Sequence, residues 1–444
     1  MDSSTFFSAQ ELAAWSGQRF QSELIYFTGL GLKVVFLLVV MLSGIHLALR
    51  HKCQSAAAWL YERRSLTGMS RRVPVLKRVI CVFEKLGASL PDESHRTRWL
   101  VDAFYPLALL ILFSILCAPL SFFSGYLLEH ERGLATISLG QWWLDWTKSL
   151  FESGFLAVFL GLGLFGLVRR LRRTWWLWLW GMVVGGLLLW SMLSPYRARI
   201  YHDFRPLEDG RLKAAIQELG KQAGIGIERV EVKDSSRRTR RASAYLAGAG
   251  ATRRVVLSDN LVDEFNPREV LVAVGHELGH HVGEHSTFSW LRTALSALVF
   301  LVLCQVILWW APRVKRFGLR KNVDPAVLPL LLLALEILFL VNAPVSASLD
   351  RREENSADGH ALRLTRDPAA FCSLFIRLNR LNQADPRPPG WVQFLFGHHP
   401  TTMERISRGF EWAKDHGMQL SAGALPLPPP TSNIMQTRRV LVPP

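Results

Sequence analysis

Residues Leu271–Thr287, with the sequence LVAVGHELGHHVGEHST, contain the motif HELGH at positions 276–280. On an α-helix, residues four positions apart lie on the same face, one turn from each other. His276 and His280 are therefore placed to bind one tetrahedral Zn²⁺ ion together. Glu277 could accept a proton from a water molecule at the open zinc position and later donate it to the leaving amine. This spacing is typical of zinc peptidases, and it predicts one catalytic zinc ion per chain.

A peptidase zinc site needs a third protein ligand and keeps its fourth position open. Glu354 and Asp358 are four residues apart, so they share a helix face. One carboxylate could bind the metal while the other orients a ligand imidazole; a solvated helix face is the alternative. His285, nine residues after His276, could instead be a ligand, a second-shell group or a helix-end residue. His281 points about 100° away from the zinc-binding face and is poorly placed.

Six segments of the chain are apolar over about 20 residues, which is the length that crosses a bilayer core. Half of the residues are hydrophobic, and the 16 tryptophans cluster near the ends of these segments, as membrane interfaces favour. We therefore predict a mainly α-helical, polytopic membrane protein. The predicted spans are Phe27–Leu49, Trp99–Ser124, Phe151–Val168, Trp175–Ser194, Thr287–Ala311 and Ala326–Ser346. Charged residues interrupt a seventh stretch, Val75–Leu90, which predicts an amphipathic or loop-borne helix.

The two last spans place the candidate zinc ligands near each other. His280 precedes the fifth predicted span by seven residues, and Glu354 follows the sixth at a similar distance. Two antiparallel spans joined by a short loop would bring both residues to the same membrane face. At a rise of 1.5 Å per helical residue, each would lie roughly 10 Å outside that face.

A small soluble α+β part is predicted between the fourth and fifth spans. Its elements are an amphipathic helix at Gly210–Gln222 and strands at Arg229–Lys233, Ala242–Gly248 and Arg253–Ser258. Asn266 and Pro267 are suited to begin the zinc helix. Further helices are predicted at Leu349–Arg380 and Pro400–Asp415.

Five regions follow from this pattern. They are 1–194 with four spans and a basic loop at 50–98, 195–286 with the soluble peptidase part, 287–347 with two further spans, 348–420 with the third zinc ligand, and 421–444, a Pro-rich tail predicted to be disordered.

The net charge of +16 predicts an anionic partner. The sequence contains no nucleic-acid-binding motif, and much of the excess charge lies in loops beside apolar spans. Anionic lipid headgroups of the bilayer are therefore the expected partner, and nucleic acid is not. The five cysteines are scattered without a CxxC motif, which indicates neither a disulfide framework nor a cysteine zinc site. The first 25 residues do not resemble a cleavable signal peptide, and no pattern indicates an oligomeric state.

Several motifs resemble the integral-membrane zinc metalloproteases typified by the eukaryotic CAAX prenyl endopeptidase and, more distantly, bacterial heat-shock membrane peptidases. The resemblance covers about residues 128–406 and is weak before Trp99. The matching residues are EHERGL at 129–134 with Asp145 and Lys148, PLEDGRLK at 206–213, Ser243-Ala244-Tyr245 with Gly248, VVL at 255–257, HELGH with His285, the ExxAD motif at 354–358, His399-Pro400 and Arg405-Ile406.

The resemblance implies a gluzincin-type zinc peptidase with helices that enclose an intramembrane chamber. It assigns Glu354 as the third zinc ligand and Asp358 as the carboxylate that accepts a hydrogen bond from a ligand imidazole, and it gives His399 and Arg405 roles in transition-state stabilisation or substrate holding. The intramembrane residue Glu336 would then line the chamber, or else form a structural hydrogen bond to another span.

The strand around Ser243, Ala244 and Tyr245 is expected to bind substrate by strand addition, with ordinary sheet core as the alternative. The family usually has Asn where this chain has Ser243, whose side chain has a shorter reach.

The distribution of basic residues predicts which side of the membrane carries the zinc site. Loops 50–98, 169–174 and 312–325 share one side and carry 11, 4 and 5 Lys and Arg, whereas segments 1–26 and 125–150 carry 1 and 2. The positive-inside rule places the basic loops in the cytoplasm and the zinc site on the extracytoplasmic face, as in a bacterial inner membrane. The resemblance points the other way, because the eukaryotic members act on the cytosolic side.

These observations predict a membrane-embedded zinc metalloendopeptidase with a polypeptide substrate, such as a membrane-associated or misfolded protein. One alternative is a non-catalytic zinc-containing scaffold or chaperone-like binder, which would not need the general base Glu277. A channel or transporter is a second alternative, although the spans contain no clear repeated halves or paired broken helices.

Overall fold

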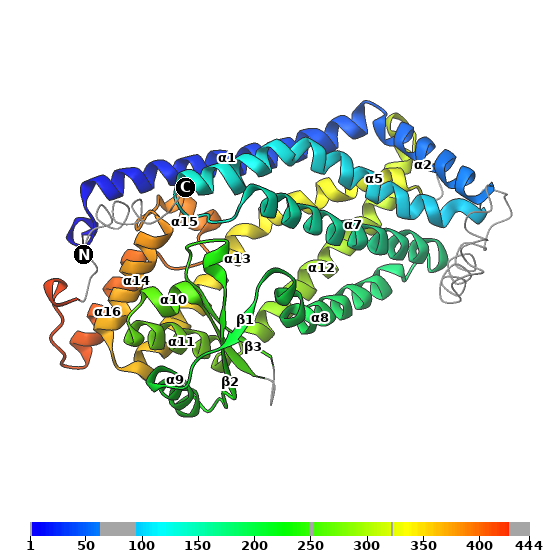
Figure 1. The fold of residues 1–444 in the computed structure, drawn as a ribbon. Coiled ribbons are helices and arrows are strands. Elements are labelled where there is room, and N and C mark those ends of the chain that lie inside the picture. Colours follow the sequence, from blue (N-terminus) through cyan, green and yellow to red (C-terminus); the bar gives the residue numbers. More distant parts are fainter. Residues whose placement is uncertain (1, 63–94, 249–252, 321–322, 426–444) are drawn as a thin grey trace.

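Six long helices dominate the computed structural model, which describes residues 2–62, 95–248, 253–320 and 323–425 (Figure 1). Among these residues, five helices are long and apolar enough to cross a membrane, and a sixth has a shorter apolar part, Trp175–Trp190. The six helices follow the order of the predicted spans. They are α1 (Ala9–Leu42), α5 (His95–Phe122), α7 (Leu139–Arg170), α8 (Trp175–Tyr201), α12 (His285–Trp310) and α13 (Leu328–Thr365).

The first helix differs most from its prediction. It begins at Ala9, well before the predicted start at Phe27, because Ser8 and Glu11 form a capping box in a polar stretch where apolar periodicity gives no signal. It ends before Gly44, whose φ of 82° breaks the helix. The additional N-terminal turns lie against the soluble part of the molecule rather than in an apolar span.

Shorter elements connect the long helices. The predicted helix at Val75–Leu90 lies outside the described residues, as does most of the predicted tail. The connecting elements are α2 (Ile45–Glu62), the π-helix η2 (Phe123–Leu127), α6 (Leu128–Glu131), η5 (Ala311–Arg313), η6 (Lys315–Phe317), η7 (Pro325–Val327) and, at the start of the tail, η8 (Ala422–Ala424).

A four-stranded sheet forms the β portion of the soluble part, with the strand order β1-β2-β4-β3. Strands β2 and β4 are parallel, and the other two pairs are antiparallel. Strand β2 has its predicted bounds, whereas the short edge strand β1, which contains Pro206, was not predicted. The elements are β1 (Phe204–Pro206), α9 (Arg211–Gln222), β2 (Arg229–Lys233), η3 (Ser235–Arg237), β3 (Ala244–Ala247), β4 (Arg254–Ser258) and α10 (Asp259–Glu264).

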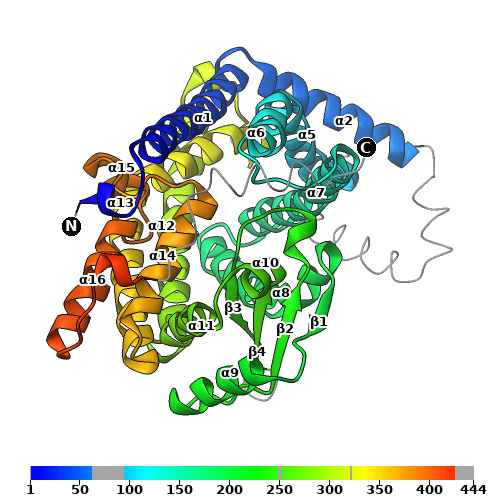
Figure 2. The same cartoon turned by 60° about the vertical axis from the view of Figure 1, so that its left-hand side comes forward.

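Helix α11 (Pro267–Val282) lies between the sheet and α14 (Pro368–Asn382) and packs against α13 (Figure 2). Asn266 and Glu269 form its capping box. The predicted helix Leu349–Arg380 is two helices: α13 continues out of the membrane region to Thr365, and α14 starts anew with Asp367 as its N-cap. The chain then forms α15 (Gly390–Phe396) and α16 (Thr402–Asp415).

Two hydrophobic cores divide the molecule. The peptidase part, comprising the sheet, α9–α11, α14 and α16, shares one core. The membrane part, comprising α2, α5, α7, α8 and α12, has the other. Helices α1 and α13 contribute to both: Trp15 and Leu362 lie in the peptidase core, and Val40 and Leu331 in the membrane core. These two helices therefore hold the two parts together.

Candidate metal centre

The imidazoles of His276 and His280 and the carboxylate of Glu354 meet at one point between α11 and α13. Their metal-binding atoms lie within 4.8 Å of one another. The Nε2 atoms of the two histidines are 3.1 Å apart, and Glu354 lies 3.4 Å from His276 Nε2 and 3.2 Å from His280 Nε2. Three residues from two helices thus form one compact donor group.

The spacing of these donors fits a small tetrahedral metal ion. With metal–ligand distances of about 2.0–2.2 Å, neighbouring tetrahedral ligands lie roughly 3.3–3.6 Å from each other. The separation of 3.1 Å between the two Nε2 atoms is close to this range, and so are the distances of 3.4 Å from His276 to Glu354 Oε2 and of 3.2 Å from His280 to Glu354 Oε1. Two imidazoles and one carboxylate also leave a fourth tetrahedral position for a reactant.

Both candidate histidine ligands have their second ring nitrogen hydrogen-bonded, which fixes the direction of the first. His276 donates from Nδ1 to Asp358 Oδ1 over 2.9 Å, and His280 Nδ1 shares a hydrogen bond of 3.0 Å with His285 Nδ1. Burial lowers the pKa of His276, but hydrogen bonds to Asp358 and Glu354 outweigh it and raise the pKa to about 9. A metal ion must therefore displace a proton there near neutral pH.

His285 reaches the site because the helix is interrupted before it, and not because of helix periodicity. The prediction assumed one continuous helix, but α11 ends at Val282 and α12 begins at His285. Glu284, with a φ of 50°, turns the chain, and Gly283 leaves room for the His285 ring, because a Cβ atom there would lie 2.3 Å from His285 Nε2. His285 contacts a candidate ligand and lies outside the donor group itself. His281 is exposed, as the helical geometry predicted.

Small residues let α11 and α13 approach closely enough to assemble the donors. A Cβ atom at Gly279 would lie 2.8 Å from the Ala357 Cα atom, closer than real contacts allow. One turn earlier, Gly275 faces Ala361 at 3.4 Å. This contact was not predicted from the sequence, although the Gly pair and the Ala pair at four-residue spacing are its visible signal.

Glu277 lies beside the donor group on α11. Burial raises the pKa of its carboxyl group, and the neighbouring His276 and His280 oppose that shift in part. A carboxylate with a raised pKa next to a metal position is suited to take up and return a proton.

His399 and Arg405 approach the site in different ways. His399 Nδ1 lies 2.8 Å from Glu354 Oε2, and its side chain is 69% exposed. The Arg405 side chain is buried, pairs with Glu354, lies 3.2 Å from Asp358 Oδ2 and stacks on the Phe375 ring. His399 is therefore open to a reactant, whereas Arg405 lies among the carboxylates that hold the donor group.

Ser243, Ala244 and Tyr245 lie at the edge of the sheet. Strand β3 is the last strand in the sheet order, and α11 packs against it. Ser243 exchanges hydrogen bonds with Ser258 on β4, and Tyr245 pairs with Val256. An edge strand beside the donor group presents main-chain groups that a further strand could pair with.

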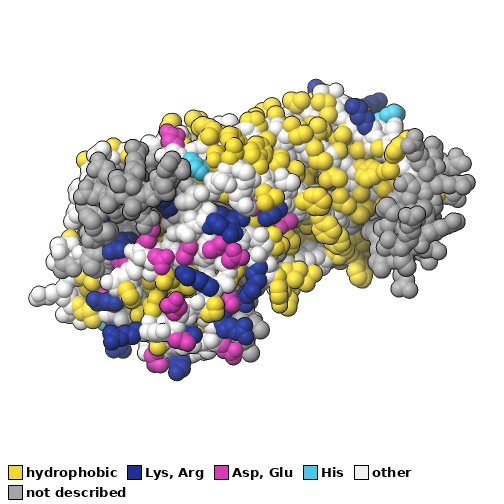
Figure 3. Space-filling view, in the orientation of Figure 1, with side chains coloured by type: hydrophobic (Ala, Val, Ile, Leu, Met, Phe, Trp, Pro, Cys, Tyr) yellow, Lys and Arg dark blue, Asp and Glu magenta, His cyan; other side chains and the backbone are white. Residues whose placement is uncertain are grey.

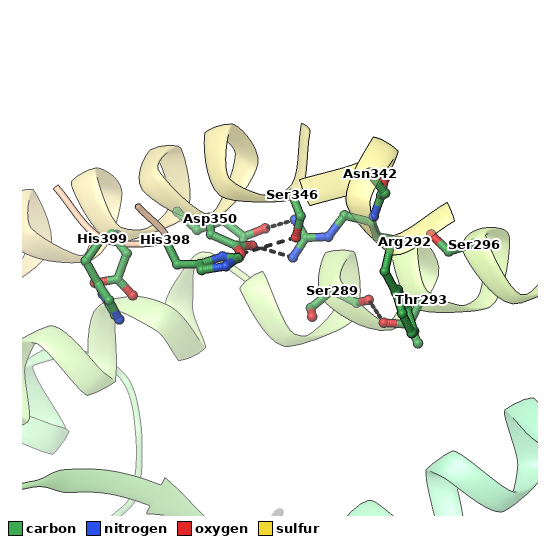
Figure 4. Close-up of a pocket in the computed structure, with 12 residues that line it drawn as sticks. Ser289, Arg292, Thr293, Ser296, Asn342, Ser346, Asp350, His398 and His399 are labelled. Carbon is green, nitrogen blue, oxygen red and sulfur yellow. Dashed lines mark hydrogen bonds and ion pairs between the residues drawn. The ribbon is translucent and has the colours of Figure 1, made fainter. Parts of the chain in front are cut away.

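A polar cavity of about 480 Å³ opens beside Glu354, between α12, α13 and the loop of His398 and His399 (Figure 4). A larger, mainly apolar cavity of about 690 Å³ lies between the membrane helices. Thr293, Ser296, Phe339 and Asn342 line both cavities, so the two are adjacent. Glu336 lines the larger cavity and also accepts a hydrogen bond from Lys33 on α1 at 3.1 Å, so both predicted alternatives are observed.

Comparison with known proteins shows where this arrangement occurs. Residues 206–412 match peptidase family M48, and residues 73–198 match the N-terminal region of CAAX prenyl proteases, described as five membrane helices. The Bacillus subtilis metalloprotease YhfN is 30% identical over 314 residues, which cover 70% of this chain and 73% of YhfN.

Two yeast proteins extend the comparison. CAAX prenyl protease 1 of Saccharomyces cerevisiae is 27% identical over 344 residues, covering 72% of this chain and 75% of the yeast protein. The crystal structure of Ste24p from S. mikatae has the same fold, with a TM-score of 0.65 at 21% identity, covering 82% of this chain and 89% of Ste24p. The predicted membrane-spanning helical fold is thereby confirmed. The chain belongs to peptidase family M48, as a multi-pass membrane metalloprotease.

Proposed function

We propose that this protein is a zinc endopeptidase in which His276, His280 and Glu354 bind the metal and Glu277 is the general base. The observation that carries the proposal is the donor group itself: the two histidine Nε2 atoms lie 3.1 Å apart, and the two carboxylate oxygens of Glu354 lie 3.4 Å from His276 and 3.2 Å from His280. The half-buried Glu277 lies beside it. Two histidines and one glutamate are a ligand set of catalytic zinc in peptidases. Asp358 and His285 hold the ligand imidazoles in position.

When bound, zinc would polarise the scissile carbonyl and lower the pKa of a reacting water molecule. Glu277 takes a proton from that water as it attacks the carbonyl carbon, and it then protonates the leaving amine. His399, exposed next to Glu354, donates a hydrogen bond to the developing oxyanion. We assign Arg405 to holding Glu354 and Asp358 instead of the substrate, because its side chain is buried against both.

The substrate class we propose is an extended segment of a membrane-associated or misfolded polypeptide. Strand β3, with Ser243, Ala244 and Tyr245, would bind it by strand addition, since main-chain hydrogen bonds tolerate varied side chains. The apolar cavity adjacent to the site supports a substrate with an apolar stretch near the scissile bond. Anionic lipid headgroups are the proposed neighbours of the basic loops.

We propose that the metal centre faces the extracytoplasmic side of a bacterial inner membrane. The basic loops 169–174 and 312–325 follow the ends of α7 and α12 that point away from the peptidase part, which supports the charge count made on the sequence (Figure 1). A reporter enzyme that is active only outside the cytoplasm, fused after Pro444, should be active. An active cytoplasmic reporter at the same position would reverse the assignment.

The function is tested by comparing the parent protein with Glu277→Gln in one detergent. Bound zinc and cleavage of an unfolded membrane-protein substrate are measured together. The substitution keeps the side-chain size and all three metal ligands, so zinc should stay near one per chain while the rate falls by roughly 10²–10⁴-fold. Equal cleavage by both proteins contradicts the role of Glu277. Bound zinc with no cleavage by either, across a broad peptide panel, favours a structural site.

A further inference from the structure

The loop that carries His399 makes a second contact with α13 that the mechanism above does not use. His398 Nδ1 lies 2.7 Å from Asp350 Oδ2, while the adjacent His399 reaches Glu354. Asp350 and Glu354 are four residues apart and so lie one turn from each other on α13. Two consecutive histidines of the loop therefore dock on two consecutive carboxylates of one helix face.

Asp350 is itself held in place from α12. Its Oδ1 atom accepts a hydrogen bond from Arg292 Nη2 at 2.6 Å, so each of its two carboxylate oxygens has a separate partner. Arg292 also pairs with Glu353 at 3.3 Å. Figure 4 shows Arg292, Asp350 and His398 in one row along the polar cavity, with His399 at its end. Charge-assisted bonds of this kind restrain geometry more strongly than neutral ones.

The backbone next to His398 is tied to α13 on one side and to α15 on the other. Arg351 donates to the carbonyl oxygens of Gln393 and Gly397 at 2.8 and 2.6 Å, and Gln393 Nε2 donates to the His399 carbonyl oxygen at 2.8 Å. The loop has no regular secondary structure between α15 and α16. Side-chain contacts with α13 and α15 therefore determine where its residues lie.

We propose that Asp350, oriented by Arg292, is a positioning residue that sets the location of His399 through His398. If His398 leaves Asp350, the loop loses the side-chain anchor one residue before His399, only the backbone bonds of Gly397 and His399 remain, and the His399 ring is held less firmly beside Glu354. The inference rests on the proposed role of His399 in catalysis. A displacement of about 1 Å at a reacting group can cost up to 100-fold in rate.

The first test is Asp350→Asn, which removes the charge with little change in size. We expect kcat to fall by about tenfold and KM to change by less than twofold, because the residue acts on the reacting group through His399. Glu353→Gln is the matched control. Like Asp350, Glu353 lies on α13 and pairs with Arg292, but its ion pair does not involve the loop. It should change kcat by less than twofold. An equal, small effect of both variants overturns the proposal.

The second test places Asp350→Asn in a His399→Ala background. If Asp350 acts through His399, it has little further effect there, whereas a second tenfold loss shows that it acts elsewhere. If His399→Ala is fully active, both this proposal and the catalytic role of His399 are wrong. The role of Glu277 is then still tested separately by Glu277→Gln. Metal content and the thermal midpoint should match the parent in every variant.

Hydrogen–deuterium exchange gives a readout that does not depend on activity. Amides of residues 393–400 should exchange several-fold faster in Asp350→Asn than in the parent or in Glu353→Gln, while peptides from α11 exchange alike. If His399→Ala is too slow to assay, this measurement alone tests the proposal. Unchanged exchange in residues 393–400 overturns the proposal.

Discussion

The peptidase part and the membrane part place their apolar side chains in opposite ways. In the peptidase part, residues such as Leu374 and Ile376 are buried beneath a surface with many charged side chains. In the membrane part, large apolar residues such as Phe155 and Leu295 lie on the outside. Figure 3 shows apolar side chains covering much of the surface of this part. An apolar residue is therefore driven inward only where water is the surrounding solvent.

The largest expected difference between the two parts is the cost of truncating a leucine. Leu374 on α14 is 1% exposed, so Leu374→Ala leaves a cavity and should cost about 2–5 kcal/mol. Leu295 on α12 is 60% exposed, and lipid tails or detergent surround it whether or not the helices are packed. Leu295→Ala should therefore cost less than about 1 kcal/mol.

Thermal unfolding in one detergent compares the two variants. A drop of several degrees for Leu374→Ala, with a midpoint close to the parent for Leu295→Ala, supports the comparison. If Leu295→Ala lowers the midpoint as much, the outer face of α12 is a packing surface, and the membrane part is buried against another protein.

The contact between the two parts at α11 and α13 gives a second prediction. Gly279→Ala would normally stabilise a helix by about 1 kcal/mol. Here the new methyl group meets the Ala357 backbone, so the helices must separate and draw Glu354 away from His276. We expect kcat/KM to fall by about 100-fold with weaker metal binding.

The control is Gly359→Ala on α13, where the new Cβ atom meets only the flexible end of Arg363 at 3.4 Å. This variant should keep both its activity and its metal. Normal metal affinity in Gly279→Ala would mean that α11 and α13 can separate without disturbing the donors.

The membrane helices and most peptidase strands could be predicted because their signals are local. Apolar length marks a span, alternation marks a strand such as β2, and Asn266 with Pro267 marks the start of α11. The polar start of α1 and the short strand β1 were not predicted, because partners far away in the sequence stabilise them. Arg19 of α1, for example, pairs with Asp385.

The candidate site divides in the same way. His276 and His280 follow from helix periodicity, and Glu354 with Asp358 follows from the same spacing together with the family resemblance. The approach of α11 to α13 at Gly279 and the burial of Arg405 depend on tertiary contacts. The contact of His285 with His280 depends on the end of α11 next to Gly283, and the sequence pattern predicted a continuous helix there.

The smallest expected effect concerns ion pairs in the two parts. Lys33 and Glu336 pair at 3.1 Å in the wall of the apolar cavity, whereas Lys213 and Asp209 pair at 2.6 Å on the surface of the peptidase part. Removing one partner in apolar surroundings leaves an uncompensated charge. Both partners of the membrane pair are partly exposed to the cavity, so we expect Glu336→Gln to cost about 1 kcal/mol and not the 3–5 kcal/mol of a fully buried pair.

The double variant Lys33→Met/Glu336→Gln separates a charge effect from a packing effect. It should regain most of the thermal midpoint that Glu336→Gln loses, because no lone charge remains in the apolar wall. Asp209→Asn should shift the midpoint very little, since water screens this exposed pair. If Glu336→Gln is as neutral as Asp209→Asn, water fills the cavity around the pair, and the interior of the membrane part resembles the peptidase surface in its polarity.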